Sequence, residues 1–169
     1  MNGVYLRNMD FDKYYELVKP HIEANVDPKY NYEDIARALK ERVQLINEVD
    51  EMVDFFNEVK DYSLDLYTNK KAKTNPEVAR KSLELALPAL EALEVFNNET
   101  VFEALAKVAA DNGLKNITVM YPVQVALSGK DKTPGGATML SQILGKEETL
   151  KRLKVAIEKF SMNNKKVLH

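Results

Sequence analysis

The stretch Tyr121–Leu153 reads YPVQVALSGKDKTPGGATMLSQILGKEETLKRL, and it decides the fold expected for this chain. Apolar residues recur at helical spacing before Gly129, where the helix is expected to end because glycine readily adopts the left-handed conformation that closes helices. Residues 130–136 include two lysines, a proline and two glycines, which predicts a basic turn. A short helix over Ala137–Leu144 follows, and another helix opens at Glu147. The stretch therefore predicts a helix, a basic loop, a helix, a tight turn and a helix.

Helical patterns also fill most of the chain before this stretch. Apolar residues recur at helical spacing over residues 10–18, after which Pro20 is expected to kink or end the helix. The same spacing recurs over residues 31–56, which form either one long helix or two helices joined near residues 48–50. Asn75 is expected to cap a further helix, because a proline and a glutamate follow it directly.

One segment departs from the helical pattern. Residues 62–67 alternate enough to suggest a short strand, although their helical context also fits a compact loop. With helices expected on both sides of this segment, the chain is predicted to be all-α, with seven to nine helices in two packed helical subdomains. We place the first subdomain at residues 1–75 and the second, which contains the basic loop, at residues 76–169.

Composition describes an ordinary globular protein. Of the 169 residues, 45% are hydrophobic and 30% are charged, which is enough apolar material for a real core. The absence of cysteine excludes disulfides, a thiolate nucleophile and cysteine-ligated metals. Neither a signal peptide nor an apolar run of membrane-spanning length is recognised. We therefore expect a cytoplasmic protein, most simply a monomer, that does not contact a membrane.

Charge is distributed unevenly along the chain. Residues 1–100 hold 13 Lys and Arg against 20 Asp and Glu, a net charge of −7, whereas residues 101–169 hold 11 against 6, a net charge of +5. A basic half attracts polyanions, and contacts to phosphates would make such binding sensitive to salt. The alternative is that these lysines only keep the helices soluble, and composition alone favours that alternative.

The chain offers few groups for catalysis. His21 is interpreted as a surface or satisfied histidine, and His169 is the terminal residue. The motifs of zinc proteases, P-loop nucleotide-binding proteins, serine hydrolases and Rossmann folds are absent. The acidic run at residues 48–54 lacks the alternating oxygen ligands and central glycine of an EF-hand, so it is interpreted as a solvated helix face. We therefore assign no catalytic residue, no metal ligand and no cofactor-binding residue.

Two segments carry a resemblance to a known family. In order, the chain contains Pro122-Val-Gln-Val-Ala-Leu-Ser-Gly129, Thr133-Pro-Gly135, Ile143-Leu-Gly-Lys-Glu147 and Leu150-x-x-Leu153. This order resembles the pattern P-L-R-V-A-L-T-G, S-P-G and L-L-G-K-E-R-x-L-x-R-L near the C-terminus of bacterial glutamyl-tRNA synthetases. Residues 2–7, NGVYLR, are similar to the family's N-G-x-Y-I-R segment, which lies where the chain enters the helical anticodon-binding region. The resemblance covers essentially the whole chain, most strongly in these two segments.

The resemblance implies an excised C-terminal, all-α anticodon-binding domain. Its function would be recognition of the tRNA anticodon for a glutamate–tRNA ligase, whose missing catalytic domain attaches glutamate to tRNA with ATP and Mg²⁺. The HIGH-like and KMSKS-like signatures of class I synthetases are absent, so this fragment is expected to need no cofactor and to activate no glutamate. The alternative, from a different class, is a helical protein-interaction or scaffold module without RNA binding. Such a module has no reason to reproduce the order of these motifs.

The family reads the anticodon with two arginines. Arranging residues 38–49 against the family pattern puts Arg42 on the arginine that reads the third anticodon base and favours glutamate over glutamine anticodons. The second arginine is replaced by Gln124, which can still hydrogen-bond a base edge but adds no charge. The expected partner is therefore the glutamate tRNA, with the glutamine tRNA as the alternative. For Arg42 the other interpretation is an ordinary exposed arginine that pairs with an acidic side chain one turn away.

Four further basic residues are candidates for contacts to RNA phosphates. Lys130 and Lys132 lie in the basic loop, and Lys146 lies at a helix start, where main-chain N–H groups also meet phosphate. The alternative for these lysines is that they only make the loops soluble. Arg7 lies near the implied domain junction, where it either contacts RNA or fixes the first segment of the chain through a salt bridge.

Overall fold

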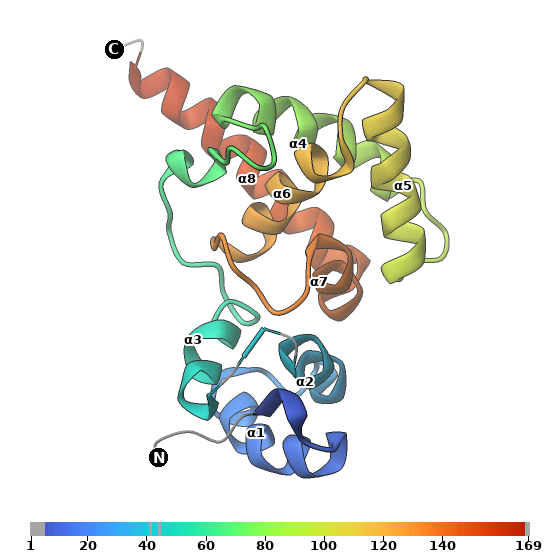
Figure 1. Ribbon diagram of the computed structural model, residues 1–169. Coiled ribbons are helices and arrows are strands. Elements are labelled where there is room, and N and C mark those ends of the chain that lie inside the picture. The colour runs from blue at the N-terminus through green and yellow to red at the C-terminus, as the bar shows by residue number, and fades with distance from the viewer. Residues whose placement is uncertain (1–5, 41, 44, 168–169) are drawn as a thin grey trace.

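The computed structural model describes residues 6–40, 42–43 and 45–167 of the chain. Its described part contains eight α-helices, three short 3-10 helices and no strand, which confirms the all-α prediction (Figure 1). The α-helices are α1 (Phe11–Asn25), α2 (Tyr32–Lys40), α3 (Val49–Val53), α4 (Pro76–Glu91), α5 (Asn98–Asp111), α6 (Asn116–Ser128), α7 (Ala137–Leu144) and α8 (Lys146–Val167), and the 3-10 helices are η1 (Leu6–Asn8), η2 (Ile46–Glu48) and η3 (Leu64–Tyr67).

The helices form two groups in space (Figure 1). In the first helix group, residues 6–56, α1 packs against α2 and α3. In the second helix group, residues 64–167, α4 packs against α5, α6 and α8, and α7 covers α5 and α6. Residues 57–63, which we call the linker, join the two groups without regular structure. Buried apolar side chains of both groups belong to one continuous hydrophobic core.

The segment just after the linker packs with the second helix group. η3 contacts α4 and α6, and the Tyr121 hydroxyl donates to the Leu66 carbonyl oxygen at 2.8 Å. The Thr118 hydroxyl donates in the same way to the Ala72 carbonyl oxygen at 2.6 Å. The division of the chain into two subdomains, residues 1–75 and 76–169, stays a prediction.

The first helix group departs from the predicted helix boundaries. α1 continues through Pro20, because the helix buries Val18 and Ile22 on one face on either side of the proline. Both alternatives for residues 31–56, one long helix or two helices joined near residues 48–50, are wrong, since α2 already ends at Lys40 and α3 begins only at Val49. After α2 the chain closes in a turn in which the N–H groups of two residues, Arg42 and Val43, both donate to the Leu39 carbonyl oxygen, at 2.8 and 2.9 Å.

The segment suggested as a strand is not one. Residues 64–67 form η3, capped by the Ser63 hydroxyl, which accepts from the Asp65 N–H at 3.2 Å. The alternative of a compact loop is therefore the correct one. Tertiary packing explains this conformation, because Tyr67 is fully buried and its ring lies 5.0 Å from that of Phe160 on α8.

The later helix signals are confirmed. The Asn75 side chain caps α4 by accepting from the Val78 N–H at 2.9 Å, and α7 has exactly the predicted bounds. α4 also passes through an internal proline, Pro88, without ending. Within the described residues, none of the helices combines the length and the apolar character that crossing a membrane requires.

Candidate nucleic-acid interface

The basic loop, residues 129–136, starts from the end of α6. Gly129 closes this helix with φ of +70°, in the left-handed conformation that only glycine adopts without strain. The glycine also passes very close to the linker. An added Cβ atom would lie 3.1 Å from side-chain atoms of both Val59 and Tyr62. The start of the loop is therefore fixed by its backbone conformation and by its contact with the linker.

Gln124 and Lys130 make the hydrogen bonds and the ion pair that orient this loop. Gln124 is partly buried on α6, and its Nε2 donates to the Asp131 carbonyl oxygen at 2.8 Å. The Lys130 N–H donates to the Ser128 hydroxyl at 3.0 Å, while its Nζ lies 3.2 Å from Oδ1 of Asp54. Because Asp54 directly follows α3, this ion pair links the basic loop to the first helix group.

The predicted base reader lies on the other side of the same junction. Arg42 is exposed in the turn after α2, and within the described residues its side chain has no ion pair. Ala38, one turn earlier on α2, faces the basic loop, since a Cβ added at Gly135 would lie 3.4 Å from the Ala38 Cβ. Lys132 is exposed in that loop. The fold thus brings the turn with Arg42 and the basic loop, with Lys130, Lys132 and the Gln124 side chain bonded to it, to the junction of the two helix groups.

Two further predicted contacts, those of Lys146 and Arg7, stay untested. Lys146 begins α8, and its Nζ donates to the Leu93 carbonyl oxygen at 2.6 Å, which ties α8 to the end of α4. Its proposed phosphate contact stays a prediction. Arg7 lies in η1, but its side chain lies outside the described part of the structure, as does His169, so the prediction for Arg7 is also untested.

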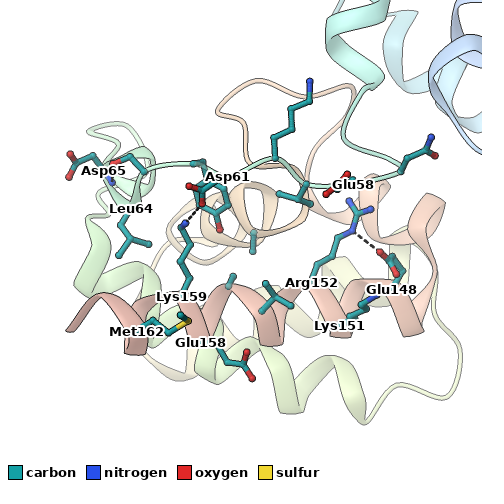
Figure 2. A pocket seen from close by; sticks show the side chains of 18 residues that line it. Glu58, Asp61, Leu64, Asp65, Glu148, Lys151, Arg152, Glu158, Lys159 and Met162 are labelled. Atoms are coloured by element: carbon teal, nitrogen blue, oxygen red, sulfur yellow. Dashed lines mark hydrogen bonds and ion pairs between the residues drawn. The ribbon is translucent and has the colours of Figure 1, made fainter. Parts of the chain in front are cut away.

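Sequence reasoning missed the most completely bonded charge at the junction, Arg152. This α8 residue is only 6% exposed, and its Nη1 donates to the carbonyl oxygens of Phe55 and Leu127 at 2.9 and 2.7 Å. Its Nη2 donates to the Phe56 carbonyl oxygen at 2.7 Å, and its Nε to Oε1 of Glu148 at 3.0 Å (Figure 2). The available signal was the arginine in the closing L-x-R-L of the family pattern, which falls on this position.

A groove of about 860 Å³ lies between the linker and α8 (Figure 2). Charges of both signs line it, and Nζ of Lys159 pairs with Oδ1 of Asp61 at 2.6 Å. Glu58 and Glu158 add further carboxylates. Since RNA phosphates require an excess of positive charge, the groove is a poorer candidate for RNA than the basic loop, where Lys132 is exposed.

The acidic run at residues 48–54 is more than a solvated face, which corrects that interpretation. Asp50 accepts from Nδ2 of Asn25 at 2.7 Å and lies 3.3 Å from Nδ1 of His21, so it ties α3 to α1. His21 is therefore a satisfied histidine, as predicted. Among the residues described here, no cluster of three or more histidine or acidic side chains is arranged to hold a metal ion.

Comparison with known proteins identifies the family and several relatives of this chain. The family described as the anticodon binding domain matches residues 13–157. The chain is 42% identical over 159 residues to the glutamate–tRNA ligase of Clostridium tetani, which covers 94% of this chain and 33% of the relative. It is also 42% identical over 161 residues to that of Lachnoclostridium phytofermentans, with 95% and 33% covered.

Solved structures give the same result. A crystal structure of a glutamate tRNA ligase from Elizabethkingia meningosepticum matches with a TM-score of 0.70 at 26% identity, over 92% of this chain and 30% of that one. The glutamate-tRNA synthetase of Elizabethkingia anophelis matches with a TM-score of 0.68 over 91% and 30%. This chain spans about a third of the length of these relatives. The matches support a role in tRNA recognition and not the scaffold alternative. The chain belongs to the anticodon-binding domain family.

Proposed function

We propose that this chain recognises the anticodon loop of a tRNA as one part of a glutamate–tRNA ligase. One observation carries the proposal beyond family membership. Arg42 of the first helix group and the basic loop of the second flank the same surface junction, from which a single RNA loop can be contacted on both sides. Anticodons suit such a junction, because proteins read single-stranded RNA loops by separating the bases and hydrogen-bonding their edges.

Arg42 is the proposed base reader. Its backbone is fixed by the turn after α2, and its exposed guanidinium keeps the planar pair of donors that recognises a base edge. Through this contact we propose a preference for the glutamate tRNA, with weaker use of the glutamine tRNA.

Gln124 is proposed to contribute a different kind of contact. Its Nε2 already donates one hydrogen bond to Asp131 and keeps one further hydrogen, while its Oε1 can accept. It therefore offers a donor and an acceptor without a positive charge. Where the family places an arginine, this chain is expected to bind the neighbouring base less strongly.

Lys132 is the strongest candidate for a phosphate contact. It is exposed in the basic loop, and no ion pair involves it within the described residues. Lys130 is a weaker candidate, because a phosphate would have to compete with Asp54 for its ammonium group. Attachment of glutamate, with ATP and Mg²⁺, is assigned to the catalytic part of the parent enzyme, and the whole protein is expected to act as a cytoplasmic monomer.

Binding of a labelled glutamate-tRNA anticodon stem-loop, measured at two salt concentrations, tests this function. A stem-loop with a scrambled loop is the control. We expect binding that weakens with salt and prefers the true loop, because base contacts add to phosphate contacts. Equal affinity for the two loops, at low salt and high protein concentration, would contradict anticodon recognition by this chain.

A further inference from the structure

The two halves of the proposed interface belong to different helix groups. Arg42 lies in the first, while Gln124 and Lys132 lie in the second, and only the irregular linker connects the groups along the chain. Two contacts made to one RNA loop reinforce each other most strongly when their spacing is fixed before binding, since otherwise ordering them costs binding free energy. The two groups share a hydrophobic core, and directional contacts across the junction add to it in holding the groups at one spacing.

Arg152 is placed to do this. Its guanidinium binds the carbonyl oxygens of Phe55 and Phe56, where the first helix group ends, and that of Leu127, three residues beyond Gln124 on α6. These are three fixed backbone positions on two sides of the junction. The planar guanidinium presents its donors in a rigid fork, so bonds to all three oxygens define one relative position of the groups.

The Asp54–Lys130 ion pair, another charged contact across the junction, is less rigid. In the Asp54–Lys130 ion pair the side chains are 23% and 29% exposed, against 5% for the Arg152 side chain. Partly exposed ion pairs are screened by salt and contribute little free energy, whereas the buried guanidinium of Arg152 makes four hydrogen bonds away from solvent. The hydrogen bonds of Arg152 are therefore the more rigid of these two contacts, and they restrict the relative position of the helix groups most strongly.

We propose that Arg152 is a positioning residue that fixes the spacing between Arg42 and the basic loop, so that one RNA loop engages both at once. It acts through the backbone and touches no RNA itself. The effect on RNA binding rests on the proposed function, whereas the fixed spacing of the two helix groups does not depend on it. Without Arg152 each helix group would keep its own contacts to RNA, and the two sets of contacts would no longer cooperate.

The spacing can be measured without RNA. The chain has no cysteine, so Glu16→Cys on α1 and Glu103→Cys on α5, both exposed, allow two spin labels to be attached specifically. Electron spin resonance then gives the distribution of distances between the groups. We expect a narrow distribution with Arg152, a broad one in Arg152→Met and an intermediate one in Arg152→Lys, which keeps the charge but loses the fork. Arg80→Met is the matched control, because it removes an exposed arginine paired with Glu84.

The second measurement is RNA binding by the same variants. We expect Arg152→Met to bind the true stem-loop at least about tenfold more weakly, since two linked contacts commonly gain more than this over one. Replacing Arg42 by glutamine should then have little further effect in the Arg152→Met background. If Arg152→Met does not fold, Arg152→Lys provides both measurements.

The outcomes separate the two proposals. A narrow, unchanged distance distribution in Arg152→Met, or in Arg152→Lys if only that variant folds, would overturn the positioning role. A full penalty for Arg42→Gln in the Arg152 variant would overturn it as well. If the unmodified protein shows no preference for the true loop, the proposed function fails, while a broadened distribution still establishes that Arg152 fixes the spacing.

Discussion

Nη2 of Arg152 donates to the carbonyl oxygen of Phe56 at 2.7 Å, although the two residues are 96 positions apart in the chain. Phe56 is fully buried, and its ring lies 4.3 Å from that of Phe55, whose carbonyl oxygen binds the same guanidinium. These carbonyl groups belong to the end of the first helix group, where no helix hydrogen bond satisfies them. One side chain of α8 therefore completes the backbone hydrogen bonding of a distant helix group.

Arg152→Met should lower the free energy of unfolding by about 3 kcal/mol. The methionine fills part of the space but leaves the buried carbonyl oxygens of Phe55, Phe56 and Leu127 without donors. Urea denaturation followed by circular dichroism measures the loss. The matched control, Arg80→Met, removes only an exposed ion pair and should cost about 0.5 kcal/mol or less. Equal losses in the two variants would show that burial of Arg152 contributes nothing.

Gly129→Ala should cost about 2 kcal/mol, since it combines a left-handed backbone with contacts of 3.1 Å to the linker. Two glycines serve as controls. Gly113 has φ of +65° but nothing within 4 Å of an added Cβ, so its change to alanine tests the backbone term alone, about 1 kcal/mol. Gly136→Ala has neither problem and should be close to neutral. Thermal or urea unfolding ranks the three variants, and equal losses at 113 and 129 would exclude a role for the linker contact.

Stability should fall in alkali because of buried tyrosines. Burial raises the pKa of Tyr14 and Tyr67 well above the ordinary value of 10.0, since ionised rings would lose their hydration. The folded state thus favours the protonated hydroxyl groups, so their contribution is complete below pH 10 and is lost as the pH rises further. Each such tyrosine adds a slope of about 1.4 kcal/mol per pH unit above the unfolded pKa.

The Tyr14 contribution can be isolated. Tyr14→Phe removes the titrating hydroxyl group, which donates to the Ala36 carbonyl oxygen at 2.5 Å, so the variant is less stable at pH 8 but loses stability less steeply above pH 10. Urea unfolding at pH 8, 9, 10 and 10.5 gives both slopes. Parallel curves for the two proteins would mean that Tyr14 titrates in the folded state as it does in the unfolded chain.

Arg42→Gln should reduce the preference for the glutamate anticodon loop. If the guanidinium reads a base through two hydrogen bonds, its loss costs about 1–3 kcal/mol with the glutamate stem-loop and less with the glutamine stem-loop. The ratio of the two dissociation constants is the quantity to measure. The variant should fold normally, because the Arg42 side chain is exposed. An unchanged ratio would remove Arg42 from the list of base readers.

Lys132→Gln should act on affinity in a different way. A phosphate contact carries no sequence information, so both the true and the scrambled loop should bind more weakly, and the slope of log affinity against log salt should fall by about 0.7 to 1. Lys81 on α4 is also exposed but lies away from the junction, so Lys81→Gln is the control. A similar slope change in both variants would indicate general electrostatic attraction instead of a contact at the basic loop.

Much of the fold could be predicted from the sequence because its signals are local. The cap at Asn75 and the closure at Gly129 involve residues within four positions of each other, and α7 lies between two glycines that bound it on both sides. Part of the candidate site followed too, since Gln124, Lys130 and Lys132 belong to one continuous segment. The family pattern added Arg42, whose location beside that segment the sequence could not give.

The sequence by itself determined the all-α class, the helix ends marked by glycine and asparagine, and the basic loop, because capping and left-handed turns depend on neighbouring residues. Only the tertiary structure decided which lysine and arginine side chains already have a partner within the protein. Lys130 pairs with Asp54, Lys146 binds the Leu93 carbonyl oxygen 53 positions away, and Arg152 binds carbonyl oxygens up to 97 positions away. A backbone carbonyl group is present at every residue, so it leaves no signature in the sequence, and only the packing of the helices shows which one a buried cation will bind.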